Sequence, residues 1–223
     1  MIMDSEMNLV IDQFQQFEFS DPLTGMNLIY NLFIPQNYNQ NISYPLVLFI
    51  HDSGAVSSDP RMTLMQGLGG IVWASPAEQM KHESFVLAPQ YSQAIVNDES
   101  EVTRHVELTV NLIRALKDQF NIDLDRIYTT GQSMGCMASI AMLIEYPDLF
   151  AGALLIAGQW QAEKMKLLTN ANIWVVVSEG DRKAFPGMNA GMIALEDAGA
   201  NVSRGIWNGQ ASKEEFASRV NAM

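Results

Sequence analysis

RIYTTGQSMGCMASIAMLIEY, residues 126–146, is the stretch that decides the fold of this chain. A β-branched run, Ile127–Thr130, leads into Gly131–Gly135, and an apolar helical pattern follows over Met137–Tyr146. The central pentapeptide has the form G-x-S-x-G, in which glycines at both ends let a strand and a helix approach closely around a strained serine. Such a turn places the Ser133 hydroxyl above the sheet, at the N-terminus of the helix. The stretch therefore predicts a strand-turn-helix unit that presents Ser133 as a nucleophile.

Short apolar runs elsewhere predict the other strands, and longer periodic stretches predict the helices. The predicted strands are Phe14–Phe19, Met26–Phe33, Pro45–His51, Ser84–Pro89, Arg126–Thr130, Gly152–Ala157, Asn172–Ser178 and Val202–Trp207. The predicted helices are Glu101–Phe120, with a capping box formed by Asp98 and Glu101, then Met134–Tyr146, Met188–Ala198 and Ser212–Met223. The first two strands form an antiparallel hairpin, and the later alternation with helices indicates right-handed crossovers. We predict an α/β fold, a three-layer sandwich around a mostly parallel sheet.

Length and composition are those of one globular domain. The chain has 223 residues, of which 48% are hydrophobic and 17% are charged, so a disordered chain is excluded. Thirteen Lys and Arg against 25 Asp and Glu give a formal net charge of −12. This acidic balance argues against nucleic acid and anionic membranes as partners. We assign residues 1–11 to a lead segment and 12–223 to the domain.

Several kinds of site have no counterpart in the sequence. The single cysteine, Cys136, excludes an internal disulfide and a cysteine-based zinc cluster; we interpret it as a small residue packed beneath the turn. The histidines lack H-x-x-x-H spacing, so we predict neither a metal nor a cofactor. No apolar run reaches the ~20 residues that span a bilayer, and Met1–Asn8 does not fit a signal peptide. Compartment and oligomeric state stay open.

A serine nucleophile requires donors for the oxyanion that develops during attack. We expect the first donor to be the backbone N–H of Met134, the residue after the serine. The second is expected from the loop His51–Ala55, which directly follows an early strand, through the backbone N–H of Ser53. We also predict that Trp160 and Gln132 contact the substrate.

The sequence contains a candidate for the acid of a serine triad, but we assign no residue as its base. Asp181 follows the strand Asn172–Ser178 and would reach the same sheet edge as Ser133, so it is the predicted acid, with Glu179 as the second choice. The chain has three histidines, and all of them precede Ser133. They are His51, His82 and His105. We expect the first to hydrogen-bond within its own loop and the others to lie at the surface, so no histidine is assigned as the base.

The motif and several other segments together resemble a known group of proteins. The segments are Phe49–Gly54, Phe85–Gln90, Asn121–Tyr128, Gly131–Gly135 and Tyr146–Phe150. They are similar to the α/β-hydrolase esterases and predicted peptidases related to feruloyl esterases and polyhydroxybutyrate depolymerases. The resemblance runs from about residue 12 to the end of the sequence. It implies the α/β-hydrolase fold, a small-molecule ester substrate and a Ser-His-Asp triad, although Asp52 replaces the usual first glycine of the early loop.

The histidine that this resemblance implies would lie near the C-terminus, where this sequence has none. Three interpretations follow: the fold is C-terminally incomplete, the base is displaced or missing, or the chain is a non-catalytic homologue that binds a ligand or partner. We predict a serine hydrolase that cleaves carboxylic esters through an acyl-enzyme. The alternatives are the non-catalytic homologue and a serine peptidase. The resemblance also allows a domain of a secreted protein.

Overall fold

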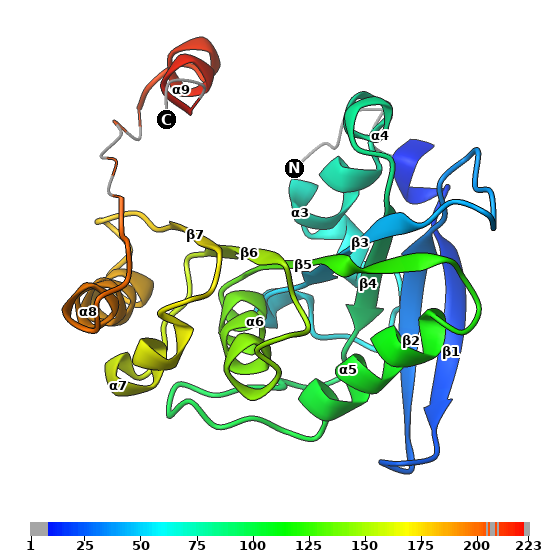
Figure 1. Ribbon diagram of the computed structural model, residues 1–223, viewed down its shortest axis with the longest axis horizontal. Coiled ribbons are helices and arrows are strands. Elements are labelled where there is room, and N and C mark those ends of the chain that lie inside the picture. The colour runs from blue at the N-terminus through cyan, green and yellow to red at the C-terminus, as the bar shows by residue number, and fades with distance from the viewer. Residues whose placement is uncertain (1–8, 204, 206–207, 209, 221–223) are drawn as a thin grey trace.

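The computed structural model describes residues 9–203, 205, 208 and 210–220, and its centre is one seven-stranded sheet (Figure 1). The strands are β1 (Gln15–Asp21), β2 (Met26–Phe33), β3 (Tyr44–Ile50), β4 (Phe85–Gln90), β5 (Ile122–Gln132), β6 (Gly152–Ile156) and β7 (Ile173–Val176). Their order across the sheet is β1-β2-β4-β3-β5-β6-β7. The β1/β2 and β2/β4 pairs are antiparallel, and the other four pairs are parallel. The predicted hairpin and mostly parallel sheet are confirmed.

Helices lie on both faces of the sheet, which gives the three predicted layers (Figure 1). The long helices α5 (His105–Leu116) and α6 (Met134–Glu145) cover one face, and the short α3 (Leu68–Ile71) and α4 (Pro76–Lys81) lie on the other. Further helices are α2 (Met62–Met65), α7 (Ala162–Met165), α8 (Ala184–Asp197) and α9 (Lys213–Val220), with 3-10 turns η1 (Ser53–Ala55), η2 (Val72–Ala74) and η3 (Lys166–Leu168). This is the architecture of an α/β hydrolase.

The central strand β3 shows why a continuous apolar run folds this way. Leu46, Leu48 and Ile50 belong to the larger core cluster, together with residues of α5 and α6. Phe49, between them, belongs to a second cluster with Leu64 of α2 and other residues of that layer. Successive side chains of a strand point to opposite faces, so a strand covered on both faces is apolar throughout.

Two sequence-based predictions differ from the structure near α5. The helix begins at His105 rather than at Glu101, because Asn97 closes a separate turn. The Asn97 side-chain oxygen accepts the Glu101 N–H at 2.9 Å, and Val96 pairs with Val102 in an isolated bridge. The predicted cap, Asp98, instead contacts Lys183 and Gln159.

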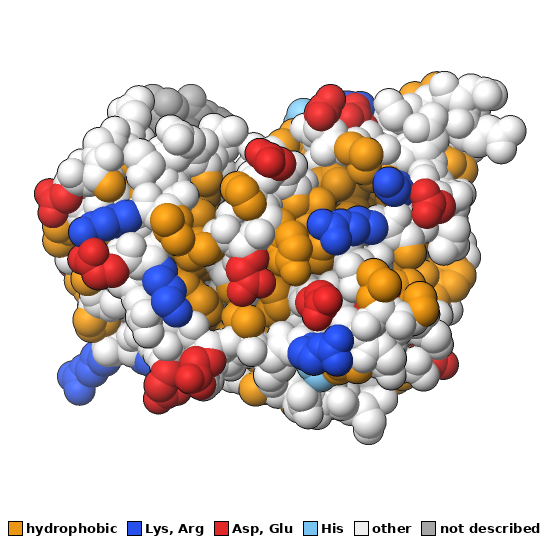
Figure 2. Space-filling view, turned by 60° about the horizontal axis from the view of Figure 1, so that its bottom comes forward, with side chains coloured by type: hydrophobic (Ala, Val, Ile, Leu, Met, Phe, Trp, Pro, Cys, Tyr) orange, Lys and Arg blue, Asp and Glu red, His pale blue; other side chains and the backbone are white. Residues whose placement is uncertain are grey.

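The C-terminal predictions are tested in part. Helix α8 begins at Ala184, four residues earlier than predicted, and α9 falls within the predicted Ser212–Met223 helix. Of the predicted strand Val202–Trp207, residues 202, 203 and 205 are described and form no strand, and the other three lie outside the described residues. On the face shown in Figure 2, acidic and basic side chains are scattered among hydrophobic ones.

Candidate active site

Ser133 occupies a strained turn between β5 and α6. Its φ is 54° and its ψ is −115°, a region that side-chain-bearing residues rarely adopt. A Cβ added at Gly131 would lie 2.6 Å from the Gly135 carbonyl carbon and 2.7 Å from the Ile50 carbonyl oxygen. A Cβ at Gly135 would overlap the same Ile50 oxygen. The two flanking glycines are therefore required by the close approach of β3, β5 and α6, as the motif predicts.

Cys136 is packed beneath this turn, as interpreted from the sequence. The side chain is fully buried, and a Cβ added at Gly158 would lie 2.5 Å from its sulfur. Burial raises the pKa of the Cys136 thiol to about 12, against weaker lowering by backbone hydrogen bonds. A thiol of this kind stays protonated and unreactive at neutral pH.

A cavity of about 270 Å³ opens beside Ser133. Its lining comes from the loop after β3, the segment 94–99, the start of α6 and the loop before α8. The lining residues are Ser53, Ala94, Val96, Asn97, Asp98, Glu99, Ser133, Met134, Met137 and Lys183. Among the described residues, neither the Ser53 nor the Met134 backbone N–H has a hydrogen-bond acceptor. Ser53, Ser133 and Met134 thus line a single cavity.

The loop after β3 is fixed by Asp52. The Asp52 carboxylate accepts the Gly54 N–H at 2.6 Å and the Gln132 side-chain amide at 3.0 Å. Its backbone N–H donates to the Gln66 side-chain oxygen at 3.0 Å. Gln132, predicted from sequence to contact substrate, is therefore hydrogen-bonded to the protein itself.

Asp181 lies beyond the carboxyl end of β7, where the sequence places it. One carboxylate oxygen, Oδ1, accepts the backbone N–H groups of Lys183 at 3.0 Å and Ala184 at 2.9 Å. These bonds satisfy donors at the start of α8. Asp181 is not among the cavity-lining residues, whereas Lys183, two positions later, is.

All three histidines are described, and none lines the cavity beside Ser133. The His51 ring is buried, with Nδ1 2.7 Å from the Asp52 carbonyl oxygen and Nε2 accepting the Tyr91 N–H at 3.1 Å. The predicted structural role of His51 within its own loop is confirmed. Burial lowers the pKa of His51, partly opposed by its contacts with Asp52, so the neutral ring is favoured.

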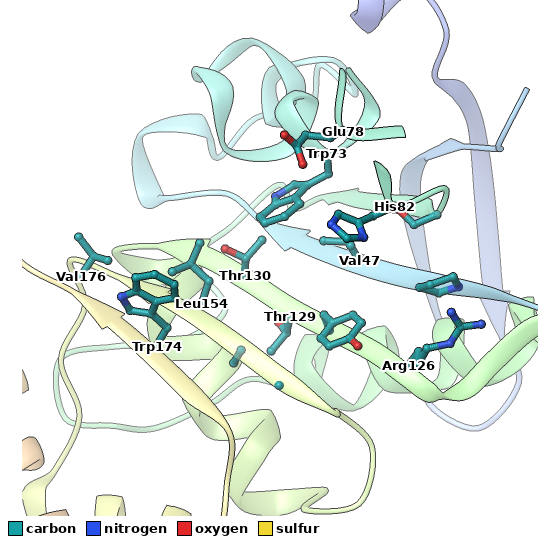
Figure 3. A pocket seen from close by; sticks show the side chains of 15 residues that line it. Val47, Trp73, Glu78, His82, Arg126, Thr129, Thr130, Leu154, Trp174 and Val176 are labelled. Carbon is teal, nitrogen blue, oxygen red and sulfur yellow. The ribbon is translucent and has the colours of Figure 1, made fainter. Parts of the chain in front are cut away.

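The other two histidines lie elsewhere. His105, half-buried at the start of α5, contacts Thr103 Oγ1 through Nδ1 at 3.1 Å, and burial lowers its pKa. His82 is exposed on a larger apolar hollow, about 720 Å³, that lies on a sheet face and does not include Ser133. Figure 3 shows His82 there, between Trp73 and Arg126.

Trp160 is placed away from both hollows. It is buried in the main core and does not line either cavity. Lys164 Nζ lies 5.9 Å from the centre of its ring. In this structure the side chain packs rather than faces the space beside Ser133.

The described residues hold no group of three or more His, Cys, Asp or Glu side chains suited to a metal ion. Across the same part of the chain, no helix has both the length and the apolar character needed to cross a bilayer.

Comparison with known proteins identifies the family. Residues 24–217 match the model of the family named Esterase and described as "Putative esterase". The chain belongs to this esterase family. The match covers both the Ser133 turn and Asp181, so the features described above lie inside the esterase region.

Individual relatives of this esterase chain carry related names. Acetylxylan esterase A of Emericella nidulans is 29% identical over 152 residues, which is 65% of this chain and 46% of that protein. A solved structure of a thermostable esterase is 33% identical, with a TM-score of 0.81 over 86% of this chain and 54% of that one. The chain spans about half the length of these two relatives.

A ferulic acid esterase structure shares the fold over nearly its whole length. Its TM-score is 0.69 at 11% identity, covering 94% of this chain and 95% of that one. At this identity the likeness supports the three-layer architecture alone.

Proposed function

We propose that this chain is a serine hydrolase that cleaves carboxylic esters of small molecules through an acyl-enzyme. The observation that carries the proposal is the strained Ser133 turn, a nucleophile elbow, opening on a cavity with two unpaired backbone donors. Membership of the esterase family supports the ester as substrate.

In this proposal the Ser133 hydroxyl oxygen adds to the ester carbonyl carbon. The carbonyl π electrons move to oxygen, and the N–H groups of Met134 and Ser53 stabilise that oxyanion as an oxyanion hole. Collapse expels the alkoxide, which takes a proton from water to become the alcohol, and the acyl group left on Ser133 is then hydrolysed by water. The N-terminus of α6 adds a favourable dipole at the same position.

The Ser133 proton has no histidine acceptor within this chain, since all three histidines lie outside the cavity. We therefore assign the proton to solvent water or hydroxide. Asp181, anchored through Oδ1 at the start of α8, is the proposed acid of the triad, the group that orients a base where one is present, and takes no part in this proton transfer. Without a base, an oxyanion hole and substrate binding still accelerate reactions by roughly 10³–10⁴ over water, so slow turnover is expected.

The test is hydrolysis of p-nitrophenyl acetate and butyrate by the protein and by Ser133→Ala. We expect slow release of p-nitrophenol that the substitution abolishes. The rate should rise continuously with pH, whereas a histidine base would give an inflection near its ordinary pKa of about 6.5. Equal turnover in Ser133→Ala would contradict the role proposed for Ser133.

A second candidate is a non-catalytic homologue that binds a ligand in the same cavity. The absence of a histidine from the cavity lining favours it. It predicts that an ester binds without being cleaved. Ester binding detected by NMR in the absence of any turnover would support this candidate over the hydrolase.

A further inference from the structure

The two donors of the proposed oxyanion hole belong to segments far apart in the sequence. The Ser53 N–H lies in the loop after β3, and the Met134 N–H begins α6. Both Ser53 and Gly54 are exposed, so the position of this loop relative to α6 depends on a few specific contacts. A donor displaced by about 1 Å can lower a rate by roughly 100-fold.

One side-chain hydrogen bond joins the two segments directly. Gln132 Nε2 donates to Asp52 Oδ2 at 3.0 Å. Asp52 immediately precedes Ser53, and Gln132 lies two residues before Met134. The bond therefore connects the residue next to one donor with a residue two positions before the other.

The remaining polar groups of Asp52 fix its own loop. Oδ1 accepts the Gly54 N–H at 2.6 Å, and the backbone N–H donates to Gln66 Oε1 at 3.0 Å. The Asp52 carbonyl oxygen contacts His51 Nδ1 at 2.7 Å and accepts the Ala55 N–H. The backbone N–H of Asp52 is thus paired with Gln66, and those of Gly54 and Ala55 are paired with Asp52. Among the described residues, the Ser53 N–H between them has no acceptor.

We infer that Asp52 and Gln132 form a clamp that sets the spacing of the two oxyanion donors, and that both are positioning residues for ester cleavage. The inference rests on the proposed function of Ser133. Gln132, the residue before the serine of the G-x-S-x-G motif, then holds the loop after β3, whereas the sequence predicted that it contacts the substrate. The clamp acts on the transition state, because the oxyanion forms after the ester has bound.

The decisive experiment compares kcat and KM for p-nitrophenyl butyrate across a set of variants. In Asp52→Ala both carboxylate bonds are lost, and in Gln132→Glu two carboxylates repel each other. We expect each variant to lower kcat by roughly 10- to 100-fold, which does not exceed the fall in kcat caused by removing a whole oxyanion donor. KM should stay within about twofold of its starting value.

The double variant Asp52→Asn with Gln132→Glu supplies the rescue. The side-chain oxygen of the introduced asparagine still accepts the Gly54 N–H, and its amide donates to the new carboxylate, so the bond returns with donor and acceptor exchanged. We expect kcat to recover to within about threefold of the starting protein, a coupling that independent sites would not show. Asp148→Ala, which removes one exposed carboxylate from the turn after α6, is the matched control and should leave kcat unchanged.

The outcomes separate the clamp from the proposed function. Turnover that depends on Ser133 but is unchanged in Asp52→Ala and Gln132→Glu would overturn the clamp and leave the nucleophile assignment standing. A slow double variant would also overturn it, because the exchanged bond would then make no difference. Turnover that does not depend on Ser133 would overturn both. Thermal unfolding checks each variant, and should Asp52→Ala fail to fold, the Gln132→Glu pair with its rescue carries the test.

Discussion

Replacing Gly135 by alanine tests the close approach that defines the Ser133 turn. The added Cβ would overlap the Ile50 carbonyl oxygen of β3. This atom belongs to the backbone of Ile50, a fully buried residue of the central strand β3, so no side-chain rotation relieves the overlap. The chain can accommodate the methyl group only by moving α6 away from β3, which also moves the Met134 N–H.

The size of the effect follows from two opposing contributions. Overpacking a well-filled interior costs about 1–3 kcal/mol, and an overlap with backbone belongs at the upper end, ~3 kcal/mol. Alanine in place of glycine within a helix recovers up to ~1 kcal/mol, and Gly135 is the second residue of α6. We therefore expect a net loss of about 2 kcal/mol, or a decrease in Tm of about 4–8 °C for a domain of this size.

The assay is urea and thermal unfolding followed by circular dichroism. Gly180→Ala is the matched control, because the nearest atom to its added Cβ is Ser178 Oγ at 3.5 Å, an ordinary contact. That variant should stay within about 0.5 kcal/mol of the starting protein. A Gly135→Ala protein as stable as Gly180→Ala would refute the packing argument for the turn.

Three further predictions concern buried polar groups. Burial lowers the pKa of His51 below its ordinary value of 6.5, so the unfolded chain binds the proton at a higher pH than the folded protein does. The unfolding free energy should therefore fall as pH decreases from 6.5 toward the folded-state pKa. His51→Gln should weaken this pH dependence, and the control His82→Gln should keep it. Asn111→Ala should lower the unfolding free energy by about 1–3 kcal/mol, because it removes the 2.9 Å hydrogen bond from Asn111 Nδ2 to the buried Asp21 carboxylate. An unchanged midpoint of urea unfolding would contradict this. Cys136 should resist a thiol reagent such as DTNB in the native protein and react in guanidinium, since its pKa is about 12; rapid native modification would show that the thiol is accessible.

Sequence patterns predicted most of the sheet because its strands follow strong local rules. The β3 run is apolar throughout since both of its faces are covered, and the glycines around Ser133 mark a turn that other residues cannot enter. The predicted start of α5 at Glu101 was wrong because the helical spacing of apolar residues continues upstream to Val102. In the structure the Asn97 side chain instead accepts the Glu101 N–H in a non-helical turn. Such a side-chain bond leaves no trace in apolar periodicity.

Some residues of the candidate site could be found from local motifs, and others are brought there only by contacts between distant parts of the chain. Ser133 and the loop after β3 could be found from motifs, and the structure places Ser53, Ser133 and Met134 around one cavity. The contribution of segment 94–99 to its lining could not be predicted, because that segment is brought there by tertiary contacts such as Gln161 Nε2 to the Glu99 carbonyl oxygen at 2.8 Å. The Asp52–Gln132 bond joins residues 80 positions apart, and neither residue alone indicates it.

The most direct test of Ser133 as the nucleophile is covalent labelling by a fluorophosphonate probe, followed by intact-mass measurement and peptide mapping. We predict one adduct per chain, located on the peptide that contains Ser133 and absent from Ser133→Ala. An unlabelled protein, or an adduct on another residue that persists in Ser133→Ala, would contradict the claim that Ser133 is the nucleophile.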